Sequence, residues 1–353
     1  MADLILGIET SCDETAAAVL EAGEKIRSNI VASQAGLHAP YGGIVPELAS
    51  RRHLEMIGPV IRLAIREAGM DFADLSGIAV TVGPGLVGSL LVGVSAAKAL
   101  AYTLGKPLVG VNHIEGHLTA GHLDHPHLGT PYVALVASGG HTHLYHAAAP
   151  GKYSLLGCTR DDAAGEAFDK VAKILGLPYP GGPQVERVAQ AGDPRSVPFP
   201  RPILGHGSLD FSFSGLKTAV IHYLEKRGSR PPRRRGSPKA GGRDSAPLHR
   251  QLVADIAASF QQAVVDVLTR ITIKAARRVS ARRILLTGGV ACNQTLRRHL
   301  AHEAIRHGIE AYWPRPELCT DNAAMIAAAG SARLGRGELA PLDLNAAANL
   351  PLC

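Results

Sequence analysis

A pattern of apolar run, polar turn and apolar run occurs twice in this chain, and it limits the fold more than any other feature. The first copy spans residues 4–20 with its turn at 10–15, and the second spans 132–146 with its turn at 138–142. Each copy predicts a β-hairpin. Because each turn is small and rich in hydroxyl groups, it can approach a phosphate group. The repeat therefore favours two related lobes with a nucleotide cleft between them, and two ordinary hairpins are the alternative.

Two histidines, His113 and His117, lie four residues apart at the start of an expected helix over 112–120. Side chains four apart project from one face of a helix, one turn from each other, which is the spacing of a metal-binding pair. Glu115 points elsewhere, whereas the glutamate of the metalloprotease motif H-E-x-x-H directly follows the first ligand. The pattern therefore indicates a metal site more than a peptidase. The alternative is a chance pair, since the chain has 16 histidines.

Acidic residues at expected helix starts have two interpretations each. Asp321 precedes an alanine-rich helix, where its carboxylate serves as a metal ligand or as an N-cap, and the N-cap is the better explanation for Asp321 alone. The segment 161–170 begins a helix that ends near 175, and its carboxylates, Asp169 among them, are favourable partners of the helix dipole.

Glycine-rich turns follow several expected strands. The turn 83–89 lacks the Gly-Lys-Ser/Thr ending of a P-loop, so we expect a tight strand-to-helix connection there. The stretch Tyr179-Pro180-Gly181-Gly182-Pro183 is expected to be a rigid glycine–proline turn outside regular secondary structure. Asn293 follows the Gly288-Gly289 turn near a helix start, an arrangement suited to a purine base and ribose lying against backbone. Further helices are expected at 45–68, 90–104 and 251–278, and strands at 77–82 and 107–111.

Composition favours a cytoplasmic protein with room for two domains in its 353 residues. The longest apolar runs are interrupted and fall short of a membrane span, so no membrane association is expected. The N-terminus has no basic region typical of a signal peptide. The five cysteines are scattered without a C-x-x-C pair, so we expect reduced thiols.

The positive charge is concentrated in one segment. Residues 226–250 carry nine Lys or Arg against one Asp, more than the whole net charge of +7. The same segment is rich in Gly and Pro, which predicts a flexible loop without a core. It is either an arm that contacts phosphates or an insertion without a role.

Several motifs in order resemble the tRNA adenosine threonylcarbamoyltransferases, the bacterial family formerly labelled O-sialoglycoprotein endopeptidases. The resemblance runs from Glu9-Thr10-Ser11-Cys12-Asp13-Glu14-Thr15, through the two histidines and the Gly-Gly-Val-x-x-Asn turn, to Asp321-Asn322-Ala323-Ala324-Met325. It implies the α/β actin-like ATPase fold, with a first lobe of 1–124 plus 322–353 and a second of 125–321. It also implies transfer of a threonylcarbamoyl group from threonylcarbamoyl-adenylate (threonylcarbamoyl-AMP) to N6 of the adenosine 3′ of the anticodon, in tRNAs that decode codons starting with A.

The resemblance assigns roles to particular residues. His113, His117 and Asp321 are the implied ligands of one divalent metal, usually taken to be iron (Fe²⁺), with Zn²⁺ or Mg²⁺ as alternatives. Asp13 or Glu14 is our candidate for the base that accepts the N6 proton. The family's binding positions for the adenylate, or for ATP or a related adenine nucleotide, correspond to Val136, Ala137, Ser138, Gly139, Gly140, Asp169, Gly182 and Asn293. Gln294 stands where relatives commonly have Arg.

The implied partners are tRNA, a catalytically inert paralogue that pairs through the first lobe, a small ATPase, and a separate enzyme that makes the adenylate. Three other functions compete with this one. A metal-dependent peptidase would use the two histidines, and a sugar-kinase-like or Hsp70-like ATPase would use the duplicated lobes. A non-catalytic scaffold would only present the basic segment to RNA.

Overall fold

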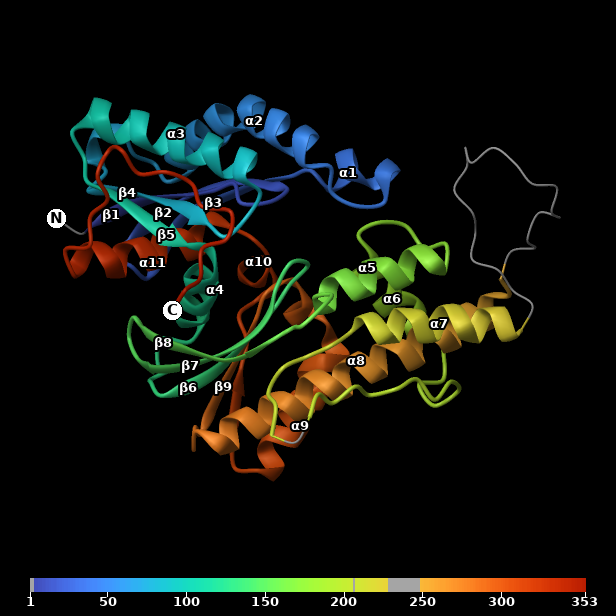
Figure 1. Cartoon of the computed structure of the whole chain (residues 1–353). Helices are drawn as coiled ribbons and strands as arrows, with labels where there is room; N and C mark the ends of the chain where they lie inside the picture. The colour runs from blue at the N-terminus through green and yellow to red at the C-terminus, as the bar shows by residue number, and fades with distance from the viewer. Residues whose placement is uncertain (1–2, 206, 228–247) are drawn as a thin grey trace. The chain divides into compact units, whose positions relative to one another are not determined.

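The computed structural model describes residues 3–205, 207–227 and 248–353 (Figure 1). Most of the basic segment, 228–247, lies outside the described residues. The chain divides into two compact units. Unit 1 comprises Met1–Thr130, Leu285–Gly289 and Tyr312–Cys353, and unit 2 comprises Pro131–Ile284 and Val290–Ala311.

The elements of unit 1 are β1 (Leu4–Glu9), β2 (Glu14–Glu21), β3 (Lys25–Ser33), α1 (Ala35–His38), η1 (Ala39–Tyr41), α2 (Pro46–Glu67), η2 (Phe72–Asp74), β4 (Gly77–Gly83), α3 (Val87–Leu104), β5 (Leu108–Asn112), α4 (His113–Asp124), α10 (Pro316–Cys319) and α11 (Ala323–Gly335). Those of unit 2 are β6 (Tyr132–Ala137), β7 (Thr142–Ala149), β8 (Lys152–Cys158), α5 (Ala164–Ile174), α6 (Gly181–Ala189), α7 (Ser214–Lys226), α8 (Arg250–Arg278) and α9 (Gln294–Arg306). Three short elements contain residues of both units: β9 (Arg283–Thr287), η3 (Gly289–Cys292) and β10 (Glu310–Tyr312).

The two five-stranded sheets have the same strand order. The first is β3-β2-β1-β4-β5, and the second, taken in the same sense, is β8-β7-β6-β9-β10. Both expected hairpins are present as antiparallel pairs, β1 with β2 and β6 with β7. The duplication expected from the repeated hairpins is therefore confirmed, and it extends over a whole sheet in each copy.

The sheet of unit 1 has helices on both faces, with α2 and α3 on one and α11 on the other (Figure 1). Leu6 and Ile8 of β1 are fully buried on the α2–α3 face, and Ile5 is buried on the α11 face. Each such side chain contributes roughly 1.5–3 kcal/mol through burial of apolar surface. Gly7 allows the close approach of α11, because a Cβ there would collide with the Ala323 carbonyl and lie 2.7 Å from the Ala327 nitrogen.

Most expected elements are found within a few residues of their expected bounds. The helix expected at 45–68 is α2, and the strands at 77–82 and 107–111 are β4 and β5. The expectation of an irregular turn at 179–183 is wrong, because α6 begins at Gly181. Pro183 lies in the first turn of α6, where the missing N–H has no intrahelical acceptor to lose.

Glycines also permit the tight connection expected after β4. A Cβ on Gly85 would lie 2.5 Å from the Ser11 carbonyl oxygen, so only glycine lets this turn pack against the β1–β2 turn. A hydrogen bond also joins the two turns, since the Leu86 amide donates to the Ser11 carbonyl over 2.8 Å. The connection is structural, as expected.

Two helices, α3 and α8, are long and apolar enough by length and composition to cross a membrane. This differs from the expectation that every apolar run is too short. In α8 most of the apolar stretch is buried inside unit 2, and α3 packs against α2 and β4. Core helices of soluble proteins pass the same test, so the finding is weak evidence for a membrane segment.

Candidate metal centre and nucleotide-binding residues

Helix α4 begins where the first histidine lies. Asn112 is its N-cap, and the side-chain oxygen of Asn112 accepts from the Ile114 amide over 2.9 Å. His113 therefore occupies the first helical position, and His117 follows one turn later on the same face. Both side chains are buried. Gly116 lies between them, where a Cβ would come within 2.8 Å of the Ile326 side chain, so α4 packs closely against α11.

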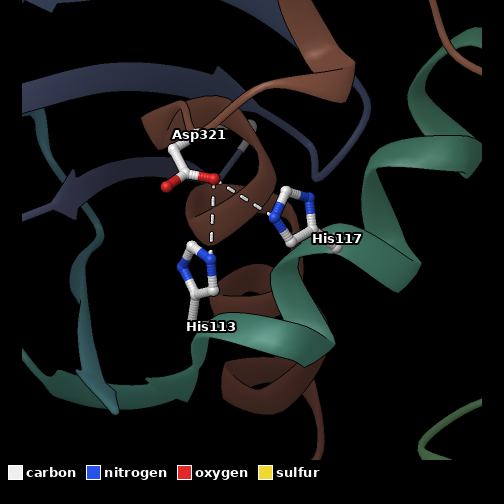
Figure 2. Close-up of side chains that lie close together, drawn as sticks. All are labelled: His113, His117 and Asp321. Carbon is white, nitrogen blue, oxygen red and sulfur yellow. Dashed lines mark ion pairs between the residues drawn. The ribbon is translucent and has the colours of Figure 1, made fainter. Parts of the chain in front are cut away.

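Asp321 lies just before α11 and faces the two histidines (Figure 2). One of its carboxylate oxygens, Oδ1, is 3.2 Å from His117 Nε2 and 3.6 Å from His113 Nε2. The interpretation of Asp321 as an N-cap is wrong, because Asn322 caps α11 by accepting from the Met325 amide over 3.1 Å. The capping function thus belongs to the next residue, and the Asp321 carboxylate is directed at the imidazoles.

These three residues fit a metal ion. One ligand atom from each of His113, His117 and Asp321 can be chosen so that all lie within 4.8 Å of one another. The His117 side chain is completely buried; its Nε2 faces the Asp321 carboxylate, while its Nδ1 makes no hydrogen bond. A buried ring nitrogen without a hydrogen-bond partner is unfavourable unless something else binds it. Two imidazoles and a carboxylate are a ligand set typical of divalent transition metals.

Burial and the surrounding charges shift the pKa values of the two histidines in opposite directions. For His113, burial opposes the charged form, but Asp321 and Glu9 outweigh it and raise the pKa to about 9. For His117, burial lowers the pKa, so its imidazole is neutral at physiological pH. A neutral imidazole is the form that binds a metal, so His117 can bind one directly, whereas His113 must first lose its Nε2 proton.

Glu9, at the end of β1, orients His113. His113 Nδ1 donates to Glu9 Oε2 over 3.0 Å, and the Thr81 hydroxyl donates to the same oxygen over 2.7 Å. The Ser11 amide donates to the other carboxylate oxygen of Glu9. Burial would raise the pKa of Glu9, but His113 outweighs it and the pKa is lowered. With its proton held at Nδ1, His113 turns Nε2 toward Asp321, the arrangement in which a carboxylate supports a metal-binding histidine.

We expect Glu9→Gln to weaken divalent-metal affinity by about 10- to 100-fold, because an amide no longer fixes the proton of His113 on Nδ1. Titration with a competing chelator of known affinity measures the effect. Glu21→Gln at the end of β2 is the matched control, because Glu21 pairs with Lys25 and Arg27. Equal metal affinities of wild type and Glu9→Gln would contradict this role for Glu9.

The β1–β2 turn brings further acidic groups close to Asp321. The charge of Asp321 contributes to raising the pKa of Asp13, Glu14 and Cys12, after the larger effect of burial. Burial and then the neighbouring Asp13 raise the pKa of Glu14 to about 8. Ser33 donates to one carboxylate oxygen of Glu14 over 2.8 Å, and the other oxygen is buried without a hydrogen bond. Both candidate bases are thus partly shielded from water and lie near the metal-binding residues.

His53 of α2 positions this turn and was not identified from the sequence. His53 Nδ1 lies 2.8 Å from the Thr15 hydroxyl, and Nε2 lies 3.0 Å from the Cys12 carbonyl oxygen. Both ring nitrogens of this buried histidine are therefore engaged by residues on either side of Asp13 and Glu14. The helical spacing of α2 shows only that His53 lies on the buried face.

Glu115, which lies between His113 and His117 in the sequence, forms an ion pair away from the metal-binding cluster. Its carboxylate is buried and binds Arg333 with an Nε to Oε2 distance of 2.7 Å. A peptidase of the H-E-x-x-H type needs a glutamate that faces the metal, and Glu115 is committed to this ion pair instead. The position of Glu115 therefore argues against a peptidase of this type, as its place in the sequence does.

In unit 2, hydrogen bonds tie Ser138 and Asp169, two of the predicted nucleotide-binding residues, to neighbouring elements. The Gly165 amide at the start of α5 donates to the Ser138 carbonyl over 3.1 Å. The Asp169 carboxylate accepts from the Gly181 amide over 2.7 Å, which joins α5 to α6 next to Gly182. These bonds join the β6–β7 turn to the start of α5, and the middle of α5 to the start of α6. Val136 and Ala137 are buried at the end of β6, while no atom lies within 4 Å of a Cβ built on Gly139, Gly140 or Gly182.

Asn293 is the N-cap of α9. Its side-chain oxygen accepts from the Leu296 amide over 2.9 Å, and its amide nitrogen donates to Gln261 of α8 over 2.8 Å. The next residue, Gln294, donates its backbone amide to Glu186 of α6 over 2.7 Å. A polar cavity of about 200 Å³ is lined by residues of α6, α8 and α9, including Glu186 and Gln261. Neither of these two was identified from the sequence.

The paired sheets define a protein of the actin-like ATPase class, and the buried cluster adds a site that fits a metal. Component A of (R)-2-hydroxyglutaryl-CoA dehydratase from Acidaminococcus fermentans has a similar fold, with a TM-score of 0.53 and 16% identity over 94% of this chain and 99% of that one. This likeness concerns the fold alone. The expected fold class is confirmed.

The chain belongs to the tRNA N6-adenosine threonylcarbamoyltransferase family, whose family model matches residues 25–328. The enzymes of that name from Symbiobacterium thermophilum and Moorella thermoacetica are 54% and 53% identical to it. Each comparison covers 99% of this chain and 97% of the relative. The chain is therefore an acyltransferase that modifies tRNA, as the resemblance implied.

Proposed function

We propose that this chain transfers a threonylcarbamoyl group from threonylcarbamoyl-adenylate to N6 of the adenosine 3′ of the anticodon, in tRNAs that decode codons starting with A. The observation that carries the proposal is the buried cluster of His113, His117 and Asp321 with two carboxylates nearby, in a chain of this family. A divalent cation that polarises the acyl group and a base that accepts the amine proton together promote acyl transfer to a weak nucleophile.

His113, His117 and Asp321 hold the metal in this proposal, and Fe²⁺ is the proposed ion, with Zn²⁺ and Mg²⁺ as alternatives. When bound, such an ion acts as a Lewis acid toward oxygens of the acyl-phosphate. Glu9 keeps His113 in the tautomer whose Nε2 is available. His53 holds the turn that carries Asp13 and Glu14.

Asp13 or Glu14 accepts the proton of the attacking amine. The N6 lone pair is delocalised into the purine ring, so the amine becomes a better nucleophile as its proton is removed. The new bond joins N6 to the carbamoyl carbon, the bond from that carbon to the phosphate oxygen breaks, and AMP leaves. With its pKa raised to about 8, Glu14 is a stronger base than an ordinary carboxylate in the fraction of chains in which it is ionised.

Residues of unit 2 bind the adenine nucleotide, either the adenylate donor or ATP. Gly139 and Gly140 of the β6–β7 turn offer their backbone amides to phosphate oxygens, whereas the Ser138 amide donates to the His141 carbonyl. Asp169 and Gly182 lie where a ribose hydroxyl can be bound, and Asn293 lies next to the polar cavity between α6, α8 and α9.

We expect an adenylate analogue to raise the thermal unfolding temperature of the chain and Asp169→Ala or Asn293→Ala to reduce that shift. A ligand that binds only the folded state stabilises it by about 2.7 kcal/mol at 100 times its Kd. The comparison is the ligand-induced shift of each variant, because both substitutions also lower stability without ligand by removing a helix cap or an inter-helix bond. Asp193→Ala, which removes an exposed carboxylate from the loop after α6, is the control. If the ligand raised the unfolding temperature of both variants as much as that of the wild type, this assignment of the nucleotide site would be ruled out.

Several further properties belong to the same proposal. The chain acts in the cytoplasm with an inert paralogue that pairs through the first lobe, a small ATPase and an enzyme that makes the adenylate. The lobes correspond to 1–124 with 322–353 and to 125–321. The basic segment 226–250 contacts tRNA phosphates.

Mass analysis of nucleosides tests the activity directly. Unmodified tRNA is incubated with this chain, its proposed partners, threonine, bicarbonate and ATP, and the nucleosides are then released and weighed. We expect a threonylcarbamoyl adduct on adenosine that is absent when the chain is omitted. Failure to form the adduct with all components present would overturn the proposed activity.

A further inference from the structure

Helices α8 and α9 of unit 2 pack against each other, and residues of both helices line a groove. Its volume is about 900 Å³, several times that of the polar cavity near Asn293. None of its lining residues belongs to the metal-binding cluster or to the predicted nucleotide-binding set. The exposed side chains of Arg270, Lys274, Arg277 and Arg278 line its α8 side. We call this feature the α8–α9 groove.

The charge of the α8–α9 groove is strongly positive. Its two carboxylates are already neutralised, since Asp266 pairs with Arg201 over 3.0 Å and Glu303 pairs with Arg306 over 3.0 Å. Within the part of the chain that the structure describes, none of the four cations on α8 pairs with a carboxylate. A row of four positive charges without carboxylate partners among the described residues thus lines one wall of the groove.

The four cations do not all have a structural explanation. Arg277 and Arg278 lie in the last turn of α8, where the helix dipole favours positive charge. Lys274 and Arg278 also donate to the carbonyls of Ser208 and Gly207. Arg270 lies two turns before the end of α8, beyond the reach of the dipole effect. Among the described residues, neither Arg270 nor Arg277 makes a side-chain hydrogen bond or ion pair.

Arg270 and Arg277 are suited to bind phosphate. They lie seven residues apart on one face of α8, which corresponds to roughly 10 Å along the axis. A guanidinium group offers a planar fork of donors that matches a phosphate, and it is more weakly hydrated than an ammonium group. Two such groups in an open groove fit an extended polyanion whose phosphates repeat along its length, rather than a single small anion.

We propose that the α8–α9 groove binds backbone phosphates of tRNA, as a contact surface separate from the residues that carry out the chemistry. The choice of tRNA as the polyanion rests on the proposed function. Contacts of this kind position an RNA without reading its sequence. The groove therefore adds affinity for any tRNA and leaves the choice of the modified adenosine to other residues.

The test compares Arg270→Gln/Arg277→Gln with the control Lys152→Gln/Arg62→Gln. The control removes two exposed cations that are also without carboxylate partners among the described residues, one in each unit. Affinity for unmodified tRNA is measured at several salt concentrations. Each phosphate contact contributes roughly 0.7–0.9 to the slope of log affinity against log salt concentration. We expect the groove variant to lose about 1.4–1.8 of this slope and the control to keep the wild-type slope.

A chemical footprint provides a second measurement. Lys274 is exposed in the groove, so bound tRNA should shield its ammonium group from an amine-reactive reagent while Lys152 stays reactive. Wild-type slope in the groove variant, or unchanged labelling of Lys274 on tRNA binding, would overturn the proposal. If poly-glutamate displaced tRNA from the groove and bound there with the same affinity as tRNA, the groove would be assigned to an acidic protein instead.

The outcomes separate this proposal from the proposed function. If the wild type forms the modified nucleoside but the groove variant keeps its slope, the groove proposal fails and the activity stands. If the groove variant loses slope and the wild type forms no adduct, the groove binds RNA and the proposed activity fails.

Discussion

Replacing His117 by Ala is expected to weaken divalent-metal binding by more than about 100-fold, because loss of a ligand exceeds the 10- to 100-fold effect of losing a supporting contact. The isolated variant should then contain little metal, whereas the wild type contains about one ion per chain. Elemental analysis of the purified proteins measures the difference. The substitution removes the contact of His117 Nε2 with Asp321 but no hydrogen bond to the backbone, so we expect the fold to persist.

His122→Ala is the matched control, because His122 lies on the same helix but outside the cluster. It should keep its metal. Metal in the His113→Ala/His117→Ala double variant at the wild-type level would show that the cluster does not hold the ion. Thermal unfolding with and without a chelator separates metal loss from misfolding, because only a metal-binding chain loses stability when the chelator is added.

Glu14→Gln is expected to lower the rate of tRNA modification by about 10²- to 10⁴-fold if Glu14 is the base, which is the range for loss of general acid–base catalysis. Metal content and nucleotide binding should be unchanged. Asp13→Asn is the parallel variant, and the larger loss identifies the base. Single-turnover rates with preformed adenylate measure the chemical step. Wild-type rates in both variants would exclude the β1–β2 turn as the source of the base.

The pH dependence of stability gives a second readout for Glu14. Its pKa in the folded, metal-free chain is about 8, against an ordinary value of 4.5. The folded state binds this proton more tightly than the unfolded state, so the stabilisation is fully present below pH 4.5 and is lost as pH rises through about 8. Relative to wild type, metal-free Glu14→Gln should therefore gain on the order of 1 kcal/mol in free energy of unfolding between about pH 6 and pH 9. Urea unfolding at both pH values checks the sign.

The sequence predicts those parts of the fold whose pattern is local. Both hairpins and α2 follow from apolar periodicity, and their bounds agree with the structure within a few residues. The outer strands β3 and β8 were missed, because they are half exposed and lack a continuous apolar run. The whole of α6 was missed, because Gly181-Gly182-Pro183 suggests a turn, whereas a first helical turn needs no N–H donors.

The site is harder to predict, because residues that contact each other there are far apart in the sequence. The spacing of His113 and His117 is visible locally, but Asp321 alone is better explained as a cap. Only the fold shows that Asn322 takes the cap and that Asp321 faces the histidines. Glu9 is 104 residues from His113 in sequence, so nothing near either residue predicts their hydrogen bond. The roles carried over by resemblance in unit 2 stay predictions.

The capping of α11 by Asn322 has a consequence for biosynthesis. The chain leaves the ribosome from the N-terminus, so His113 and His117 are made about 200 residues before Asp321. Until translation passes Asn322, the nascent chain offers two imidazoles without the carboxylate, and α11 is not there to orient it. The complete ligand set therefore exists only after Asp321 has been made, so chains that terminate before this residue cannot assemble this metal centre.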